Sequence, residues 1–133
     1  MRIGEAARRS GMAAKTIRFY EEARLIEPAP RSASGYREFN DDDVRRLQFI
    51  HRARDLGFSV AEVGRLLSLW SDRERASAQV KQLALEHVAR IEAKMAELSS
   101  MRDAILHLAD RCHGDDRPEC PILDGLAGKG NAK

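Results

Sequence analysis

Apolar residues in the first half of the chain recur at the three- and four-residue spacing of helices, which predicts four short helices. The first covers about 3–10 and ends at Gly11, because glycine accepts the left-handed conformation that closes a helix. The second covers about 13–23, the third about 41–56 and the fourth about 60–70. The first two form a helix-turn-helix pattern, although any pair of antiparallel helices gives the same pattern.

The third and fourth helices also carry start signals. Asn40 is a favourable N-cap, and the three aspartates that follow it place negative charge at the positive end of the helix dipole. Ser59 and Glu62 form a capping box at the start of the fourth helix. On that helix we expect four buried side chains: Val63, Leu66, Leu67 and Trp70.

Residues 27–39 interrupt the helical pattern between the second and third helices. Their sequence, EPAPRSASGYREF, gathers proline, serine and glycine, the residues that favour turns. We therefore expect a small β-hairpin, or wing: two short extended pieces joined by a turn that consists of Pro28, Pro30, Ser32, Ser34 and Gly35.

A single long helix is predicted over about 76–110, because its apolar residues keep a spacing close to the 3.5-residue period of a coiled coil. This apolar stripe consists of Ala84, Val88, Ile91, Met95, Leu98, Met101, Ile105 and Leu108. A helix of this length extends about 50 Å, more than a small head covers. We expect the stripe to pair with a second copy in a homodimer; the alternative is a monomer whose stripe folds back on the head. A short helix over about 121–127 follows.

Composition narrows the class of protein. With 33% charged and 5% aromatic residues, the chain suits a helical protein with a modest core. The net charge is +2, but residues 1–57 hold 12 Lys+Arg against 9 Asp+Glu, so the basic surplus is N-terminal. No apolar run reaches the roughly 18–20 residues of a membrane span. The N-terminal stretch MRIGEAARRSG also lacks a signal-peptide core, so we expect a cytoplasmic protein with no membrane partner.

Catalytic motifs are missing from the sequence. The chain has four histidines but neither a nucleophile elbow nor a phosphate-binding glycine loop. Cys112 and His113 are neighbours in sequence, which by itself does not make a nucleophile–base pair. We therefore do not expect an enzyme.

Basic and aromatic residues gather on two elements that would dock on a DNA duplex. The second helix offers Lys15, Arg18 and Tyr20, and the wing offers Arg31, Tyr36 and Arg37. A helix in the major groove and a hairpin along the backbone would use such groups for base and phosphate contacts. The alternative is a solvated basic face with packed aromatic rings.

The stretch RCHGDDRPEC, residues 111–120, holds the two cysteines of the chain, Cys112 and Cys120. In a reducing cytoplasm such a pair binds metal or is redox-active more often than it forms a disulfide. Thiolates prefer Cu(I) and Zn(II) over Mg or Ca, and structural zinc usually needs four ligands. Two thiolates match a two-coordinate monovalent ion. A third ligand from His113 would admit Zn(II), and an incidental cysteine pair is a further alternative.

Three stretches, TIRFYEE, RSASGYREF and RARDLGFSVAEV, resemble the N-terminal domain of MerR-family transcription regulators. Together with the long helix and the stretch CHGDDRPECPIL, they make about residues 1–127 similar to the copper-efflux (CueR/HmrR-type) branch of that family. The resemblance implies a mainly α fold with a winged helix-turn-helix DNA-binding head over 1–71. It further implies a dimerisation helix in an antiparallel coiled coil over 72–110, and a metal-binding loop and short helix over 111–127. Residues 128–133 would form a flexible tail.

The resemblance also implies a mechanism. A homodimer would hold a promoter whose two elements are spaced too far apart for RNA polymerase, and metal binding would make it kink and untwist that spacer. By position, Lys15, Arg18 and Tyr20 match recognition-helix residues, and the three wing residues named above match wing contacts.

Ser77 bears on the choice of metal. It stands where the zinc, mercury and lead regulators of the family carry a cysteine that joins the site from the partner subunit. In the copper sensors that this chain resembles, a serine at this position accompanies a response to Cu(I), Ag(I) and Au(I). The resemblance therefore implies such an ion, bound by Cys112 and Cys120. The alternatives are a sensor of a divalent metal such as Zn(II), and a copper-buffering protein that does not bind DNA.

Overall fold

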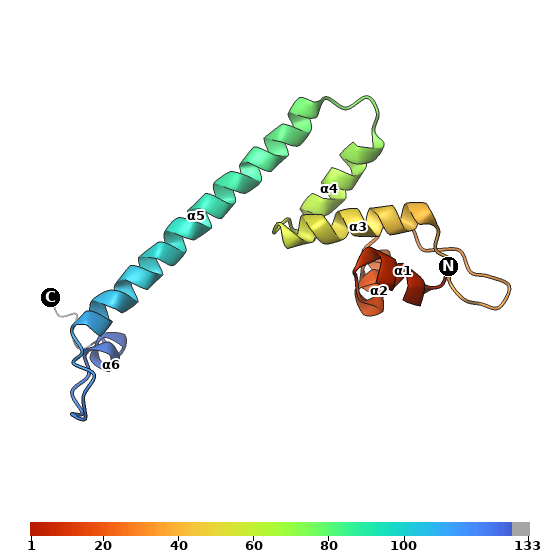
Figure 1. Ribbon diagram of the computed structural model, residues 1–133. Coiled ribbons are helices and arrows are strands. Elements are labelled where there is room, and N and C mark those ends of the chain that lie inside the picture. Colours follow the sequence, from red (N-terminus) through yellow and green to blue (C-terminus); the bar gives the residue numbers. More distant parts are fainter. Residues whose placement is uncertain (129–133) are drawn as a thin grey trace. The chain divides into compact units, whose positions relative to one another are not determined.

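The computed structural model describes residues 1–128 and is helical, as predicted (Figure 1). It divides into two compact units, Met1–Gln82 and a second that begins at Leu83. Of the tail predicted over 128–133, residues 129–133 lie outside the described residues. Within the described part, no helix is both long enough and apolar enough to cross a membrane.

The first unit contains four helices: α1 (Ile3–Ser10), α2 (Ala14–Glu22), α3 (Asp41–Asp55) and α4 (Val60–Ser71). Helix α1 packs on α2 and α3, and α3 packs on α4. The largest fully buried side chains at the centre come from α2, α3 and α4: Ile17, Leu47, Ile50 and Val63. This core fixes the direction of α2, the second helix of the predicted helix-turn-helix.

Capping residues end and start these helices as the sequence predicts. Gly11 follows α1 with φ 79°, in the left-handed region, where a side chain would be strained. The Ser59 hydroxyl accepts from the Glu62 N–H, and the Glu62 carboxylate accepts from the Ser59 N–H. At α3, Asn40 caps as expected, and Asp43 completes a second capping box that the sequence analysis did not predict.

Two of the four side chains expected to be buried on α4 are not: Leu66 is half-buried and Trp70 is exposed. Trp70 is 45% exposed, whereas Val63 and Leu67 on the same helix are buried. Its ring stacks on Phe49 of α3 with 4.6 Å between the ring centroids. Trp70 lies in the last turn of α4, where the core has already ended. The helical spacing of apolar residues continues to that turn, and it therefore assigned Trp70 to the core.

The wing between α2 and α3 is a turn held by few bonds. Among the described residues its pairing is one isolated antiparallel bridge, Arg31 with Arg37. The Ser32 N–H donates to the Tyr36 carbonyl at 2.6 Å. The hairpin expected from the sequence is therefore present as a loop closed by one bridge rather than as two regular strands.

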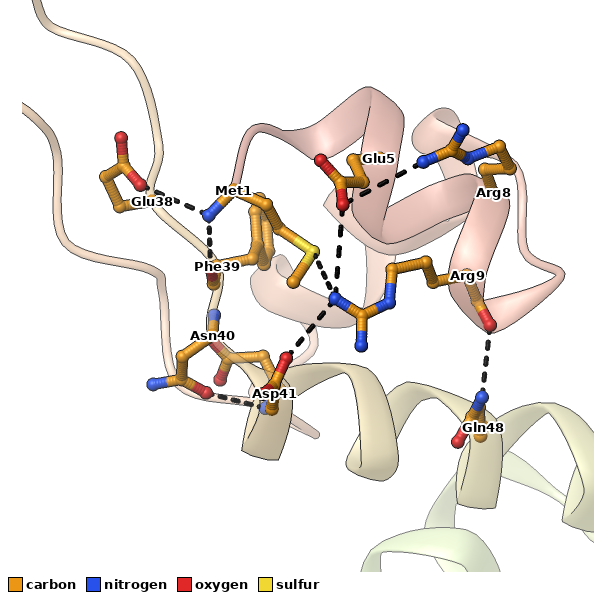
Figure 2. Close-up of polar contacts among 10 residues, drawn as sticks. Met1, Glu5, Arg8, Arg9, Glu38, Phe39, Asn40, Asp41 and Gln48 are labelled. Carbon is orange, nitrogen blue, oxygen red and sulfur yellow. Dashed lines mark hydrogen bonds and ion pairs between the residues drawn. The ribbon is translucent and has the colours of Figure 1, made fainter.

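The chain next to the wing is tied to the N-terminal segment (Figure 2). The Met1 nitrogen donates to the Phe39 carbonyl at 2.6 Å, and the Phe39 N–H donates to the Met1 carbonyl at 2.7 Å. Nη1 of Arg9 in α1 lies 3.2 Å from Oδ1 of Asp41. The backbone carbonyl of Arg9 accepts a hydrogen bond from the Gln48 side chain at 3.0 Å. These contacts hold α1, the end of the wing and the start of α3 together.

Helix α5 (Ser77–Asp110) has 34 residues and is followed by a loop and by α6 (Pro121–Leu126). The large side chains of its predicted apolar stripe are exposed along the single chain, from Ile91 at 42% to Met95 at 62%, except Leu108, which is half-buried. The exposed stripe matches the expectation of a helix that needs a partner. The predicted functional boundaries at 71/72 and 110/111 stay predictions.

Candidate nucleic-acid interface and metal-binding loop

Helix α2 turns one face to the core and the other to solvent. Ile17, Tyr20 and Glu21 are buried on the first face, while Lys15 and Arg18 are exposed on the second. The predicted DNA-binding residue Tyr20 is only 5% exposed, and its ring meets Phe19 edge-on with 5.3 Å between centroids. The structure thus gives Tyr20 a packing role, and a contact of its hydroxyl with DNA stays a prediction.

Arg18 and the three predicted wing residues line one surface cavity of about 490 Å³. Its wall is completed by the start of α1 and the turn of the wing; the lining residues are Arg2, Ile3, Gly4, Arg18, Arg31, Gly35, Tyr36 and Arg37. Lys15 and Tyr20 are not among them. A concave surface with four arginines suits a phosphate backbone, because guanidinium groups donate bidentately to phosphate oxygens.

Arg2 is the member of this surface that sequence reasoning missed. Its guanidinium carbon lies 3.9 Å from the centre of the Tyr36 ring, a cation–π contact that supports the tip of the wing. The two residues are far apart in sequence, and a lone arginine before the first helix carries no pattern. The contact depends on how the wing folds, so the sequence alone does not indicate it.

Arg31 and Arg37 have different surroundings. Arg31 is exposed and donates from Nη1 to the Gly35 carbonyl at 2.9 Å, across the turn. Arg37 is 31% exposed, and its Nη1 lies 3.0 Å from Oε1 of the buried Glu21 on α2. Arg31 therefore faces solvent, whereas Arg37 connects the wing with α2.

The two cysteines stand at the two ends of the loop between α5 and α6. Both are half-buried free thiols. The Cys112 N–H donates to the Ala109 carbonyl at 3.0 Å, which continues the last turn of α5. Cys120 is the N-cap of α6, and its carbonyl accepts from the Asp124 N–H at 3.0 Å. Each thiol is thus anchored at a helix end, with an exposed loop between them.

Helix α6 packs on the end of α5 through a glycine. A Cβ on Gly125 would lie 2.4 Å from Cδ2 of Leu108, so the two helices approach too closely there for any larger residue. Leu123 and Leu126 of α6 are 66% and 75% exposed, and Ile122 is half-buried. Helix α6, which follows Cys120, therefore lies against the end of α5, which precedes Cys112.

Charged residues shape the loop itself. Arg117 donates from Nε to Oδ2 of Asp115 at 2.8 Å, and its N–H donates to Oδ1 at 3.0 Å. These hydrogen bonds, first that of the Arg117 side chain, lower the pKa of Asp115 from its usual 3.8. Gly114 beside it has φ 69°, a conformation that favours glycine. The loop therefore has a defined turn although it is exposed.

The donor set of the loop fits a soft metal ion. The two sulfurs are its soft donors, and His113 is exposed. In the described part of the chain, no group of three or more His, Cys, Asp or Glu side chains is arranged to hold a metal. Two thiolates suit a soft metal ion rather than Mg or Ca.

Comparisons with known families identify the class of protein. Residues 1–70 match the family described as MerR HTH family regulatory protein, and residues 44–108 match that described as MerR, DNA binding. The chain therefore belongs to the MerR family of transcription regulators, and its helical head with a wing after α2 is the winged helix-turn-helix of that family. Members bind promoter DNA as dimers, and the chain is a regulator, not an enzyme.

Similar proteins place it among metal-responsive members. It is 57% identical over 96% of both chains to an HTH-type transcriptional regulator of Pseudomonas aeruginosa. It is 54% identical to HmrR of Sinorhizobium medicae, covering 99% of this chain and 90% of that one. With CueR of Salmonella typhimurium it shares 45% identity over 96% of this chain and 93% of the relative.

Two solved structures support the same grouping. The lead(II) complex of PbrR691 from Ralstonia metallidurans CH34 has a TM-score of 0.83 and 32% identity, covering 95% of this chain and 98% of that one. The mercury(II) complex of MerR from Bacillus megaterium MB1 has a TM-score of 0.74 and 33% identity, covering 96% of this chain and 99% of that one.

Proposed function

We propose that this protein is a Cu(I)-responsive transcription regulator that binds a promoter as a homodimer. With the metal bound, it activates copper-efflux genes by distorting the spacer DNA for RNA polymerase. One observation carries this proposal: Cys112 and Cys120 are free thiols at the two ends of a single loop. By the resemblance described above, Ser77 at the start of α5 stands where the divalent-metal regulators of the family carry a third cysteine. The relatives named CueR and HmrR support it.

The choice of metal follows from charge and coordination. Two thiolates complete the coordination of a two-coordinate monovalent ion and leave a single negative charge, whereas a divalent ion stays incompletely coordinated. Ag(I) and Au(I) share the preference of Cu(I) for two-coordinate sulfur and are expected to act as substitutes. A hydroxyl at position 77 offers a divalent ion no third soft donor.

The DNA-binding role rests on the head. Lys15, Arg18 and Arg31 are exposed, and Tyr36 and Arg37 complete the surface beside α2. Tyr20 stays among the proposed DNA-binding residues because its position matches the recognition helix of the family. Two such surfaces in a dimer would contact several phosphates, so we expect binding to weaken steeply with salt. Binding to DNA in this way argues against a role as a copper buffer alone.

The metal must change the energy of the DNA-bound dimer. Distorting a spacer costs about 1–6 kcal/mol, so metal binding has to favour the distorting state by a similar amount. We propose that a metal held by Cys112 and Cys120 orders the loop and α6, whose half-buried Ile122 and exposed Leu123 and Leu126 then dock on a neighbouring surface. Docking of α6 would supply that bias.

A competition titration tests the metal assignment. Cu(I) and Zn(II) are titrated into the purified dimer in the presence of a chelator of known affinity for each ion. We expect Cu(I) to bind far more tightly, Cys112→Ser and Cys120→Ser to lose it, and the loop control Asp116→Asn to keep it. Equal affinity for the two ions, or Cu(I) binding that survives both serine variants, would overturn the proposal.

A divalent sensor is the second candidate. The lead(II) and mercury(II) complexes of regulators 32% and 33% identical to this chain favour it, as does His113 beside Cys112. His113→Ala would weaken Zn(II) binding if the histidine is a ligand and would leave Cu(I) binding unchanged. Ser77→Cys should move the preference toward divalent ions.

The role of α6 has its own test. An Ile122→Asp/Leu126→Asp variant should bind Cu(I) as the wild type does but should fail to activate transcription. Both quantities are measured on the same preparation, by titration and by transcription in vitro. Full activation by this variant would remove α6 as the link between metal and DNA.

A further inference from the structure

A buried carboxylate lies beneath the proposed DNA-binding surface. Glu21 is the penultimate residue of α2 and is 4% exposed, although its neighbour Glu22 is exposed. Burying a charge is costly unless it is paired, so a carboxylate in this position needs a structural reason. None of the roles proposed above uses it.

The two oxygens of Glu21 reach the two arms of the wing. Oε2 accepts the backbone N–H of Ala29 at 3.0 Å, where the chain enters the wing. Oε1 lies 3.0 Å from Nη1 of Arg37, where the chain leaves it. Oε1 accepts no hydrogen bond from the described residues, so Arg37 supplies its compensating charge. One side chain on α2 therefore holds both arms.

This clamp matters because it ties the wing to α2 itself, whereas the contacts of Met1 with Phe39 and of Arg2 with Tyr36 tie the wing to the N-terminal segment. The pairing of the wing within residues 1–128 is the single bridge between Arg31 and Arg37. A loop held by one bridge is free to shift relative to α2 unless a tertiary contact restrains it. Arg37 can satisfy Glu21 with one nitrogen and still offer other N–H groups outward, since a guanidinium carries five donors.

We propose that Glu21 is a positioning residue for DNA binding: through Ala29 and Arg37 it fixes the wing relative to α2, so that both elements meet the duplex together. This inference rests on the proposed function, in which the surface with Arg18 and Arg37 binds promoter DNA. Glu21 itself does not touch DNA.

The sign of a charge change separates this role from simple electrostatics. Removing a carboxylate near a polyanion raises affinity if the residue acts only through its charge. Exposed Glu22→Gln should therefore bind DNA as well as the wild type or slightly better. Glu21→Gln keeps an acceptor for Ala29 but loses the charge for Arg37, and we expect its affinity to fall roughly tenfold.

The measurement uses the full-length dimer and a duplex that the wild type has selected from a random-sequence library. Fluorescence anisotropy gives the affinity over a range of salt, and thermal unfolding checks that each variant is folded. Arg18→Met should weaken binding and lower the salt slope, because it removes phosphate contacts. Glu21→Gln should weaken binding with the wild-type slope. An affinity of Glu21→Gln equal to or above that of Glu22→Gln overturns the clamp.

A double-mutant cycle completes the test and serves even if Glu21→Gln alone folds poorly. Arg37→Met leaves Glu21 buried without its counter-charge, and the double variant Glu21→Gln/Arg37→Met removes both charges. The clamp predicts that the two effects on DNA affinity are strongly non-additive, whereas those of Glu21→Gln and Arg18→Met add. Additive effects for Glu21 and Arg37 contradict it. If Arg18→Met has no effect, the proposed DNA surface itself is wrong, which is a distinguishable result.

Discussion

The head and the C-terminal loop differ in how much of their structure is fixed by burial. In the head, Ile17, Leu47, Ile50 and Val63 are fully buried. From 111 to 128, no described residue reaches the buried class, and the loop between the cysteines is exposed. A surface that reads DNA must hold its shape before DNA arrives, so it is built on a core. A loop that responds to an ion benefits from few contacts, because the ion can then decide its conformation.

The largest expected effect is a loss of metal affinity in the C-terminal loop that leaves DNA binding by the head unchanged. Cys112→Ser removes one of the two proposed metal ligands. Since even outer-sphere changes at metal sites cost about 10–100-fold, we expect more than a ~100-fold loss of Cu(I) affinity. DNA affinity without metal should equal that of the wild type, because the head is unchanged. Metal titration and anisotropy on the same sample check both. Weakened metal-free DNA binding would show that the regions are not independent.

The second prediction compares apolar truncations in the two regions. Leu47→Ala should lower the free energy of unfolding by about 2–5 kcal/mol, because it opens a cavity in the core. Leu123→Ala, at 66% exposure, should change it by less than about 0.5 kcal/mol. Urea unfolding at one protein concentration measures both. Similar losses for the two variants would mean that α6 is as well packed as the head.

The third prediction concerns the close approach of α6 and α5. A Cβ at position 125 would lie 2.4 Å from the Leu108 side chain, and overpacking costs about 1–3 kcal/mol, more than the helix propensity that alanine gains. Gly125→Ala should therefore displace α6 and lower Cu(I) affinity about threefold to tenfold. The double variant Gly125→Ala/Leu108→Ala removes the clash and should recover affinity. A defect that persists in the double variant would contradict the packing explanation.

The smallest effect is expected within the loop. The hydrogen bonds from Arg117 lower the pKa of Asp115 from 3.8, so the contact stabilises the folded loop above that pH and is lost as the pH falls through the lowered pKa. Because Asp115 is exposed, Asp115→Asn should change Cu(I) affinity by less than about threefold. An NMR titration of the carboxyl group should show its pKa rising toward 3.8 in Arg117→Gln. An unmoved pKa would assign the shift to another cause.

Local signals predicted the helices well, because their causes are local. The cap Asn40, the capping box of Ser59 and Glu62, and the glycine stop at Gly11 act within a few residues, and all three are present in the structure. The exposed stripe on α5 was likewise predicted from spacing alone.

Features that depend on distant contacts could not be predicted in this way. Arg2 joins the basic surface through Tyr36, and Glu21 holds the wing through Arg37; neither pairing has a sequence period. Tyr20 was counted with the basic residues of its helix, yet its position relative to Ile17 and Glu21 turns it inward. Burial of a residue at a helix end depends on where the neighbouring helix stops, which explains the wrong prediction for Trp70.

The most direct test of the central claim is transcription in vitro from a promoter that the protein binds, with purified RNA polymerase and with Cu(I) or Zn(II) added. The account predicts activation by Cu(I) with the wild type, none by Zn(II), and none by either ion with Cys112→Ser or Cys120→Ser. Transcription that is indifferent to Cu(I), or that responds to it without these two thiols, would contradict the account.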